Sequence, residues 1–296
     1  MNNKHLFFLL SLLICIGCST EGRRLKTESG YEYEVVRKGS DEPIPVNSYV
    51  FFNMSLMADD SLLQSTASMG KPSVLKLMED NKNYGQLKPL IDLMATMHEG
   101  DSIKFFFPLD SFENKPPTFA SLTGPLVYHV GIVDVMNEAE FEAHSDSIQQ
   151  EQEAVRQVVR DRMPDVEAKA KATYDSFKKG ELTGQIKTTE SGLRYIIHEE
   201  GDGPKPARGE QVSVHYYGML DANAQMFDSS FKGGQPYQFP LGTGQVIQGW
   251  DEGLLLLNKG TKATLFIPAS LGYGAAGSPP VIPENADLIF YVELEK

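Results

Sequence analysis

The stretch GQVIQGWDEGLLLL, residues 244–257, is the one convincing helix signal in the second half of the chain. Acidic residues stand near its start, where they favour a helix N-terminus. The segments around it are rich in β-branched and aromatic residues and predict strands. They are LRYIIHE (193–199), EQVSVHYYGML (210–220), YQFPL (237–241), KATLFIP (262–268) and DLIFYVELE (287–295). Five strands and one helix predict an α+β domain, an antiparallel sheet wrapped over a short helix. The alternation in the last strand predicts one face exposed to water.

Three blocks of this region recur, in the same order, in the first half of the chain. TESGLRYIIHEEG from Thr189 matches TESGYEYEVVRKG from Thr27, and LNKGTKATLFIP before residue 269 matches MHEGDSIKFFFP before residue 109. The C-terminal ADLIFYVELEK matches PLVYHVGIVDV. Each copy is about 110 residues long, the size of a small globular domain rather than of a solenoid repeat. The sequence therefore predicts two related domains, residues 27–136 and 185–296.

Residues 137–184, between the copies, are rich in Glu, Gln, Ala, Lys and Arg and predict a helical linker. Pro164 should end or kink the helix at about Met163, and Gly180 and Gly184 should stop it. Apolar residues recur at helical spacing, namely Ile148, Val155, Val159, Ala170, Tyr174 and Phe177. This narrow stripe fits a helix lying on one domain or the seam of a homodimer, and a solvated spacer remains an equal alternative.

The N-terminus reads as an export signal followed by an anchor. MNNKHLFFLLSLLICIGCST has one Lys and then an apolar run of 11 residues, too short to span a bilayer comfortably. CIGC resembles the lipobox of bacterial lipoproteins, which implies a signal peptide over 1–17, a lipidated Cys18 and a tether over 18–26. Cys15 departs from that motif, and the alternative is an ordinary signal peptide with an incidental cysteine. Ser19 resembles the sorting choice for an outer membrane, which implies a lipid-anchored protein of the cell envelope, on its periplasmic or surface face.

Charge and residue spacing exclude several classes of partner and cofactor. The net charge of −13 argues against a nucleic-acid partner, which needs a basic face. The six His show no metal-ligand spacing, and LGTGQVIQGW lacks the βαβ context of a nucleotide-binding fold. We therefore expect no metal and no cofactor.

Several motifs of the second copy resemble those of FKBP-type peptidyl-prolyl isomerases, in order and in spacing. They are VHYYGML, FDSS, GQVIQGWDEGL, GYGAAG and IPENADLIFYVEL. The resemblance covers residues 185–296, and the extension on an exported chain is similar to the Mip-like and FkpA-like bacterial branch. It implies an isomerase of X–Pro bonds that assists the folding of exported proteins in the bacterial cell envelope. Its partners would be proline-containing, unfolded or partly folded proteins.

The resemblance also implies a pocket and its residues. The implied catalytic residues are Tyr216, Phe227, Asp228, Trp250 and Tyr273, and the implied substrate-binding residues are Tyr237, Val246, Ile247, Ile282 and Phe290. Trp250 would form the floor, the Ile247 N–H would donate to a ligand carbonyl, and the Tyr273 hydroxyl would face the substrate. Tyr237 stands where the family usually has Phe, and Ser278 where many members have His. From the residues alone, the aromatics also fit an ordinary core, and Asp228 fits an Asx-type turn.

The first copy lacks these residues. Met54 stands where Tyr216 would be, LQST where FDSS would be, and Leu90 where Trp250 would be. SFENKPPTFASLTG contains no GYG. This predicts a degenerate, inactive copy used for binding or dimerisation. It leaves an alternative function open, that of a client-binding chaperone or scaffold in which isomerisation is secondary.

Overall fold

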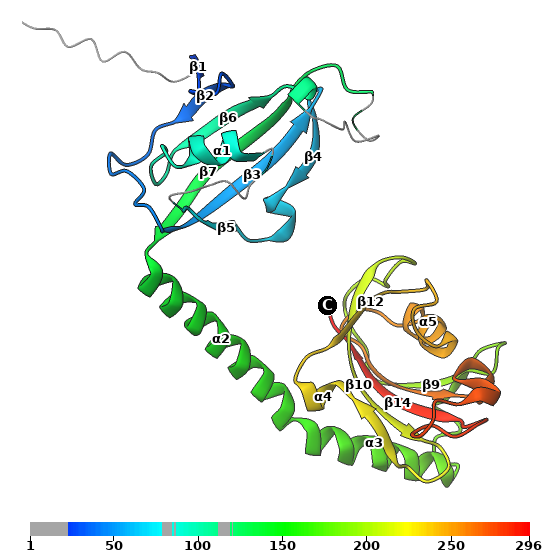
Figure 1. The fold of residues 1–296 in the computed structure, drawn as a ribbon. Coiled ribbons are helices and arrows are strands. Elements are labelled where there is room, and N and C mark those ends of the chain that lie inside the picture. The colour runs from blue at the N-terminus through cyan, green and yellow to red at the C-terminus, as the bar shows by residue number, and fades with distance from the viewer. Residues whose placement is uncertain (1–22, 79–84, 86, 112–118, 120) are drawn as a thin grey trace, which may run out of the picture. The chain divides into compact units, whose positions relative to one another are not determined.

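The computed structural model (Figure 1) describes residues 23–78, 85, 87–111, 119 and 121–296. The predicted signal peptide and Cys18 lie outside the described residues. The chain divides into two compact units, with the boundary between Asp146 and Ser147. No helix among the described residues combines the length and the apolarity that a bilayer span requires.

The C-terminal unit is built on a seven-stranded antiparallel sheet in the order β11-β10-β14-β13-β9-β8, with β12 also paired to β10. The strands are β8 (Lys187–Thr188), β9 (Arg194–Glu199), β10 (Gln211–Leu220), β11 (Met226–Ser229), β12 (Tyr237–Pro240), β13 (Lys262–Ile267) and β14 (Leu288–Leu294). All five predicted strands are present, and β8 and β11 are additional. The predicted helix is α5 (Gln248–Leu255), so the mixed helix and antiparallel-sheet class is confirmed.

This sheet is covered on both faces. Its inner face, with Val214 and Phe290, packs against Trp250 and Leu254 of α5. Its outer face, with Tyr217, Ile289 and Tyr291, packs against α3 (Met163–Lys178). The prediction of a water-exposed face on β14 is therefore wrong, because residues far upstream in the sequence cover it.

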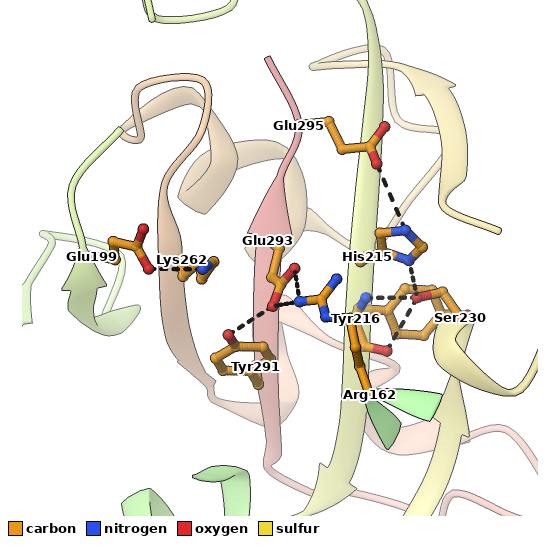
Figure 2. A network of polar contacts seen from close by, with 9 residues as sticks. All are labelled: Arg162, Glu199, His215, Tyr216, Ser230, Lys262, Tyr291, Glu293 and Glu295. Carbon is orange, nitrogen blue, oxygen red and sulfur yellow. Dashed lines mark hydrogen bonds and ion pairs between the residues drawn. The ribbon is translucent and has the colours of Figure 1, made fainter. Parts of the chain in front are cut away.

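Two helices precede the sheet, α2 (Glu138–Asp161) and α3. Arg162, two residues before Pro164, separates them. Ala170 is fully buried against the outer face, and the Phe177 and Phe266 rings stack at 4.1 Å. Arg162 Nη2 lies 2.6 Å from both carboxylate oxygens of Glu293, as Figure 2 shows. The second half of the predicted apolar stripe thus lies on the C-terminal sheet, which is one of the alternatives that the sequence left open.

The N-terminal unit repeats the strand order, β1-β2-β6-β7-β3-β4 with β5 also on β3. Its strands are β1 (Arg24–Lys26), β2 (Glu32–Arg37), β3 (Tyr49–Ala58), β4 (Ser61–Ser65), β5 (Ser73–Lys76), β6 (Ser102–Phe107) and β7 (Leu126–Met136). The short helix α1 (Lys88–Met94) stands where α5 stands in the C-terminal unit, and α4 (Ser230–Gly233) corresponds to a 3-10 turn, Thr66–Met69.

One close approach of the backbone recurs in both units. A Cβ on Gly39 would lie 2.0 Å from the Glu99 carbonyl oxygen, and a Cβ on Gly201 would lie 2.2 Å from that of Lys259. The Gly39 N–H donates to Asp101 Oδ1, and the Gly201 N–H donates to Thr261 Oγ1. Only glycine allows this approach, so both sheets depend on the same contact.

Candidate functional site

A cavity of about 540 Å³ opens on the inner face of the C-terminal sheet, beside α5. Its described lining is Tyr216, Phe227, Asp228, Tyr237, Gly244, Gln245, Val246, Ile247, Trp250, Tyr273 and Phe290. The structure thus brings together nine of the ten residues singled out from the sequence. Ile282 is not among these lining residues, but it packs in the same buried cluster as Trp250 and Phe290.

The floor of the cavity is a set of aromatic rings packed edge to face. The Trp250 ring meets Tyr216 at 5.1 Å and 79°, and Phe290 at 5.2 Å and 80°. Phe227 meets Phe290 at 5.3 Å and 83°. Such T-shaped pairs hold the rings in defined positions, and Trp250 is 4% exposed. The buried Trp250 Nε1 has no hydrogen-bond partner among the described residues.

Gly218 makes this ring arrangement possible. It is paired with Phe290 across β10 and β14, and a Cβ here would lie 2.7 Å from a Phe290 ring carbon and 2.8 Å from two of Phe227. Any larger side chain would displace the wall of the cavity. The sequence analysis did not single out Gly218. Its one signal in the sequence is that it is a glycine within a predicted strand.

A tyrosine and a carboxylate meet at the rim. Tyr216 Oη donates to Asp228 Oδ2 at 2.5 Å, and the Ser229 N–H donates to Asp228 Oδ1 at 2.8 Å. Burial raises the pKa of Tyr216 above its usual value, and the bond to Asp228 raises it further, so this phenol stays protonated. The N-cap residue of α4 is Ser229 and not Asp228. The Ser229 side chain accepts from the Phe231 N–H.

Two further hydroxyls line the cavity. Tyr273 is 40% exposed and Tyr237 45% exposed. Burial raises the pKa of Tyr273, and the nearby Asp228 carboxylate adds to this. The Tyr237 ring is stacked on Phe239 at 5.4 Å, which fixes its plane. The rim can therefore offer neutral hydrogen-bond donors to an apolar guest.

The loop before α5 is held by Asp251. Its two carboxylate oxygens accept from the Gly242 and Gly244 N–H groups, each at 2.8 Å. Ile247 follows as the N-cap residue of α5, with its carbonyl accepting from the Trp250 N–H. The sequence marked the acids of this helix only as dipole partners. In the structure Asp251 positions the loop that carries Val246 and Ile247.

The corresponding positions of the N-terminal unit follow from strand register. The Tyr216 N–H donates to Ser230 Oγ and the Met54 N–H donates to Thr66 Oγ1, so Met54 occupies the place of Tyr216. Leu56 opposes Gln64 and Tyr128, as Gly218 opposes Asp228 and Phe290. A leucine side chain thus fills the space that Gly218 leaves open. Leu90 of α1 is buried in the core.

Known proteins match the C-terminal part of the chain. A family model described as FKBP-type peptidyl-prolyl cis-trans isomerase matches residues 203–295. "FK506-binding protein 1" of Dictyostelium discoideum is 50% identical over 103 residues, 35% of this chain and 95% of that protein. "Peptidyl-prolyl cis-trans isomerase FPR2" of Saccharomyces cerevisiae is 45% identical over 38% of this chain and 84% of its own. "Probable FKBP-type peptidyl-prolyl cis-trans isomerase" of Haemophilus influenzae is 39% identical over 165 residues, 55% of this chain and 66% of its own.

Proposed function

Because this chain belongs to the FKBP-type peptidyl-prolyl cis-trans isomerases, we propose that its C-terminal cavity turns X–Pro bonds of exported proteins as they fold in the bacterial cell envelope. The observation that carries the catalytic part is the aromatic floor of Trp250, Tyr216 and Phe290 with neutral donors at its rim. No bond is broken in this reaction, so it requires no nucleophile and no proton relay.

The proposed mechanism rests on the polarity of the cavity. Turning a peptide bond must overcome about 18–20 kcal/mol, because the planar amide is stabilised by resonance. The twisted amide has lost that resonance and carries less charge on its oxygen. An apolar cavity therefore favours the twisted form over the planar form, which water solvates better. Trp250 and Phe290 would hold the proline ring, and the Ile247 N–H and the Tyr273 hydroxyl would hold the chain around it in a turn.

In this proposal Asp228 is a positioning residue. Its acceptance of the Tyr216 hydroxyl fixes one wall of the cavity. Proline-limited refolding of a denatured protein tests the whole proposal, with the full chain compared with residues 27–136. The full chain should accelerate the slow phase and residues 27–136 should leave it unchanged. Acceleration by residues 27–136 would overturn the view of the first copy as degenerate.

The envelope location rests on the sequence of residues 1–19, which lie outside the described residues. A lipid on Cys18 would keep the protein on a membrane while both units stay in water. Cys18→Ser should then move the protein from the membrane pellet into the soluble fraction. Unchanged pelleting of this variant would rule out the lipid anchor.

A second function, client binding by the N-terminal unit, is favoured by its exposed apolar side chains. Leu62 is 60% exposed and Leu63 46% exposed on the edge strand β4, whereas Met226 and Phe227 at the same positions of β11 pack against the C-terminal clusters. Such a surface fits unfolded segments of a client. The Asp228→Leu chain should still suppress aggregation of an unfolded protein, and Leu62→Gln with Leu63→Gln should weaken that effect. A loss of suppression with Asp228→Leu would assign it to the cavity instead.

A further inference from the structure

The segment between β11 and β12, residues 229–236, joins two parts of the cavity rim, and we call it the rim segment. Asp228 precedes it and accepts from the Tyr216 hydroxyl. Tyr237 follows it, with its ring stacked on Phe239. The residues of the rim segment are not among the described lining of the cavity. Its position nevertheless determines where two of the lining residues stand.

The helices α2 and α3 contact both ends of the rim segment. The Gln235 side-chain oxygen accepts from Arg156 Nε at 2.9 Å and from Arg156 Nη2 at 2.8 Å, in the amide orientation that satisfies both groups. A Cβ on Gly234 would lie 2.4 Å from the Arg156 carbonyl oxygen, so the helix backbone lies against the segment as well. At the other end, Ser229 Oγ lies 3.6 Å from Met163 Sδ.

The middle of the rim segment is held by stacked side chains. The Arg162 guanidinium lies over the Phe231 ring, 5.3 Å from its centroid, and the His215 ring stacks on Phe231 at 5.0 Å. Phe231 is fully buried. Both carboxylate oxygens of Glu293 lie 2.6 Å from Arg162 Nη2, which fixes the guanidinium over the ring (Figure 2). The helix junction therefore holds the segment along its whole length.

The rim segment is bonded in turn to the wall of the cavity. His215 and Tyr216 are neighbours on β10, so their side chains point to opposite faces of the sheet. Ser230 Oγ accepts from the Tyr216 N–H at 2.8 Å and lies 3.1 Å from His215 Nδ1. Ser229 Oγ donates to the Tyr216 carbonyl at 3.0 Å. A contact from the outer face thus reaches the residue whose hydroxyl meets Asp228.

The N-terminal unit offers a comparison for this contact. Its corresponding segment is the 3-10 turn Thr66–Met69, which Gly70 ends with a φ of 68°, as Gly234 ends α4 with 71°. Among the described residues, a Cβ on Gly70 would meet nothing within 4 Å. Ala67 and Gly70 instead help to line an open groove of about 580 Å³. In the part of the chain that the structure describes, the helix contact is therefore found only beside the aromatic cavity.

We propose that this helix contact positions the isomerase cavity and that Arg156 is a positioning residue for it. By fixing the rim segment, the contact holds in place the wall that Tyr216, Asp228 and Tyr237 form. The inference deepens the proposed function and rests on it. A wall that is already fixed loses little conformational freedom when a substrate binds. Release of the rim segment should therefore raise KM more than it lowers kcat.

Substitutions at the Arg156–Gln235 pair test the proposal in the full chain. Arg156→Ala and Gln235→Ala should each lower kcat/KM for a short X–Pro peptide about three- to tenfold, chiefly through KM, as expected for one hydrogen-bonded pair. The double variant should be little worse than either single one, because both remove the same contact. Gln235→Glu keeps the acceptor and should retain the activity of the parent chain.

Arg160 is the matched control on the same helix. Like Arg156 it pairs with Glu153, but its other bonds run to Gln157 of its own helix. Arg160→Ala should therefore leave kcat and KM unchanged. An equal loss in Arg156→Ala and Arg160→Ala would overturn the proposal, since that result indicates a general effect on the helix.

Hydrogen exchange supplies a readout that does not depend on turnover. The amides of residues 229–237 should exchange at least about threefold faster in Arg156→Ala than in Arg160→Ala, and those of β13 should not change. An active parent chain with unchanged exchange or unchanged kcat/KM in Arg156→Ala would overturn this inference alone. An inactive parent chain would overturn the proposed function instead.

Discussion

The N-terminal and C-terminal sheets connect seven strands in the same order, but among the residues that the structure describes only the C-terminal sheet lines an aromatic cavity with its α5 helix. The shared features are pairings and turns, such as the close approach at Gly39 and at Gly201. The differences are a few side chains, above all Gly218 against Leu56 and Asp228 against Gln64. The comparison teaches that backbone contacts preserve this fold, whereas the cavity depends on a small number of positions that can change without loss of the sheet.

The outer faces of the two sheets also differ, since the C-terminal one is apolar and covered by a helix and the N-terminal one is polar. In the C-terminal unit Phe266, Ile289 and Tyr291 are buried under α3, and burial of such side chains stabilises by about 1.5–3 kcal/mol each. In the N-terminal unit His129 stands in the place of Tyr291, and Ser55 in the place of Tyr217. A polar outer face does not need a covering helix, which explains why that face holds a groove.

The largest effect should come from giving the C-terminal unit the leucine of the N-terminal one. Gly218→Leu forces a side chain against Phe227 and Phe290, so turnover of a short X–Pro peptide should fall roughly 100-fold, with a stability loss of about 1–3 kcal/mol from overpacking. Circular dichroism should show the sheet intact. Gly233→Ala, at a glycine with open space around it, is the control. Full turnover in Gly218→Leu would show that the cavity does not depend on the space that Gly218 leaves.

A smaller loss should follow when the rim contact is removed. Asp228→Leu and Tyr216→Phe each remove the same hydrogen bond, and each should lower turnover about tenfold while the unit stays folded. The double variant should be little worse than either single one, because the two residues act through one contact. Additive losses would show that Asp228 and Tyr216 act separately.

The strands could be predicted from the sequence, but contacts between residues distant in the sequence could not. Alternating β-branched and aromatic residues predicted five strands, and repeated blocks predicted the second sheet. The buried outer face of β14 was not predictable, because its cover lies on α3, far upstream. Gly218 and Asp251 were missed for a related reason, since each acts through a contact with residues distant in the sequence. Ile282 packs in the core cluster that also contains Trp250 and Phe290, and its part in the site stays a prediction.

Stability should depend on pH through the C-terminal unit. Burial lowers the pKa of His198 to about 4 from 6.5, and His198 bonds to the buried Thr264 hydroxyl at 2.8 Å. Below pH 6.5 His198 becomes protonated in the unfolded chain but stays neutral in the folded one. The free energy of unfolding therefore falls as pH drops from 6.5 to about 4. Since His198 is partly exposed, we expect a loss of about 1–2 kcal/mol.

Emission of Trp250, the only tryptophan, follows this unit alone during denaturant unfolding. His198→Gln should flatten the pH dependence between 6.5 and 4, with His215 retaining a share because burial lowers its pKa as well. An unchanged pH profile would show that other groups set it. Val36 occupies the matching position in the N-terminal unit, and Val36→His, half exposed, is the matched control.

The smallest effect is spectroscopic. A macrolide of the FK506 class should displace water from the mouth of the cavity and shift or quench Trp250 emission, over the concentration range that blocks turnover. Residues 27–136 contain no tryptophan and should show no signal. A constant spectrum with uninhibited turnover would mean that Trp250 is sealed core, and would remove the proposed site.

The position of β14 sets the order in which this protein can fold during synthesis. β14 is the last strand of its sheet in chain order, yet it lies in the interior of that sheet, between β10 and β13. The C-terminal sheet therefore cannot close until β14 has left the ribosome. β7 closes the N-terminal sheet by Met136, so the first unit can fold before the strands of the second sheet are synthesised. A nascent chain stalled before Leu288 should accordingly hold one protease-resistant unit and one that is still digestible.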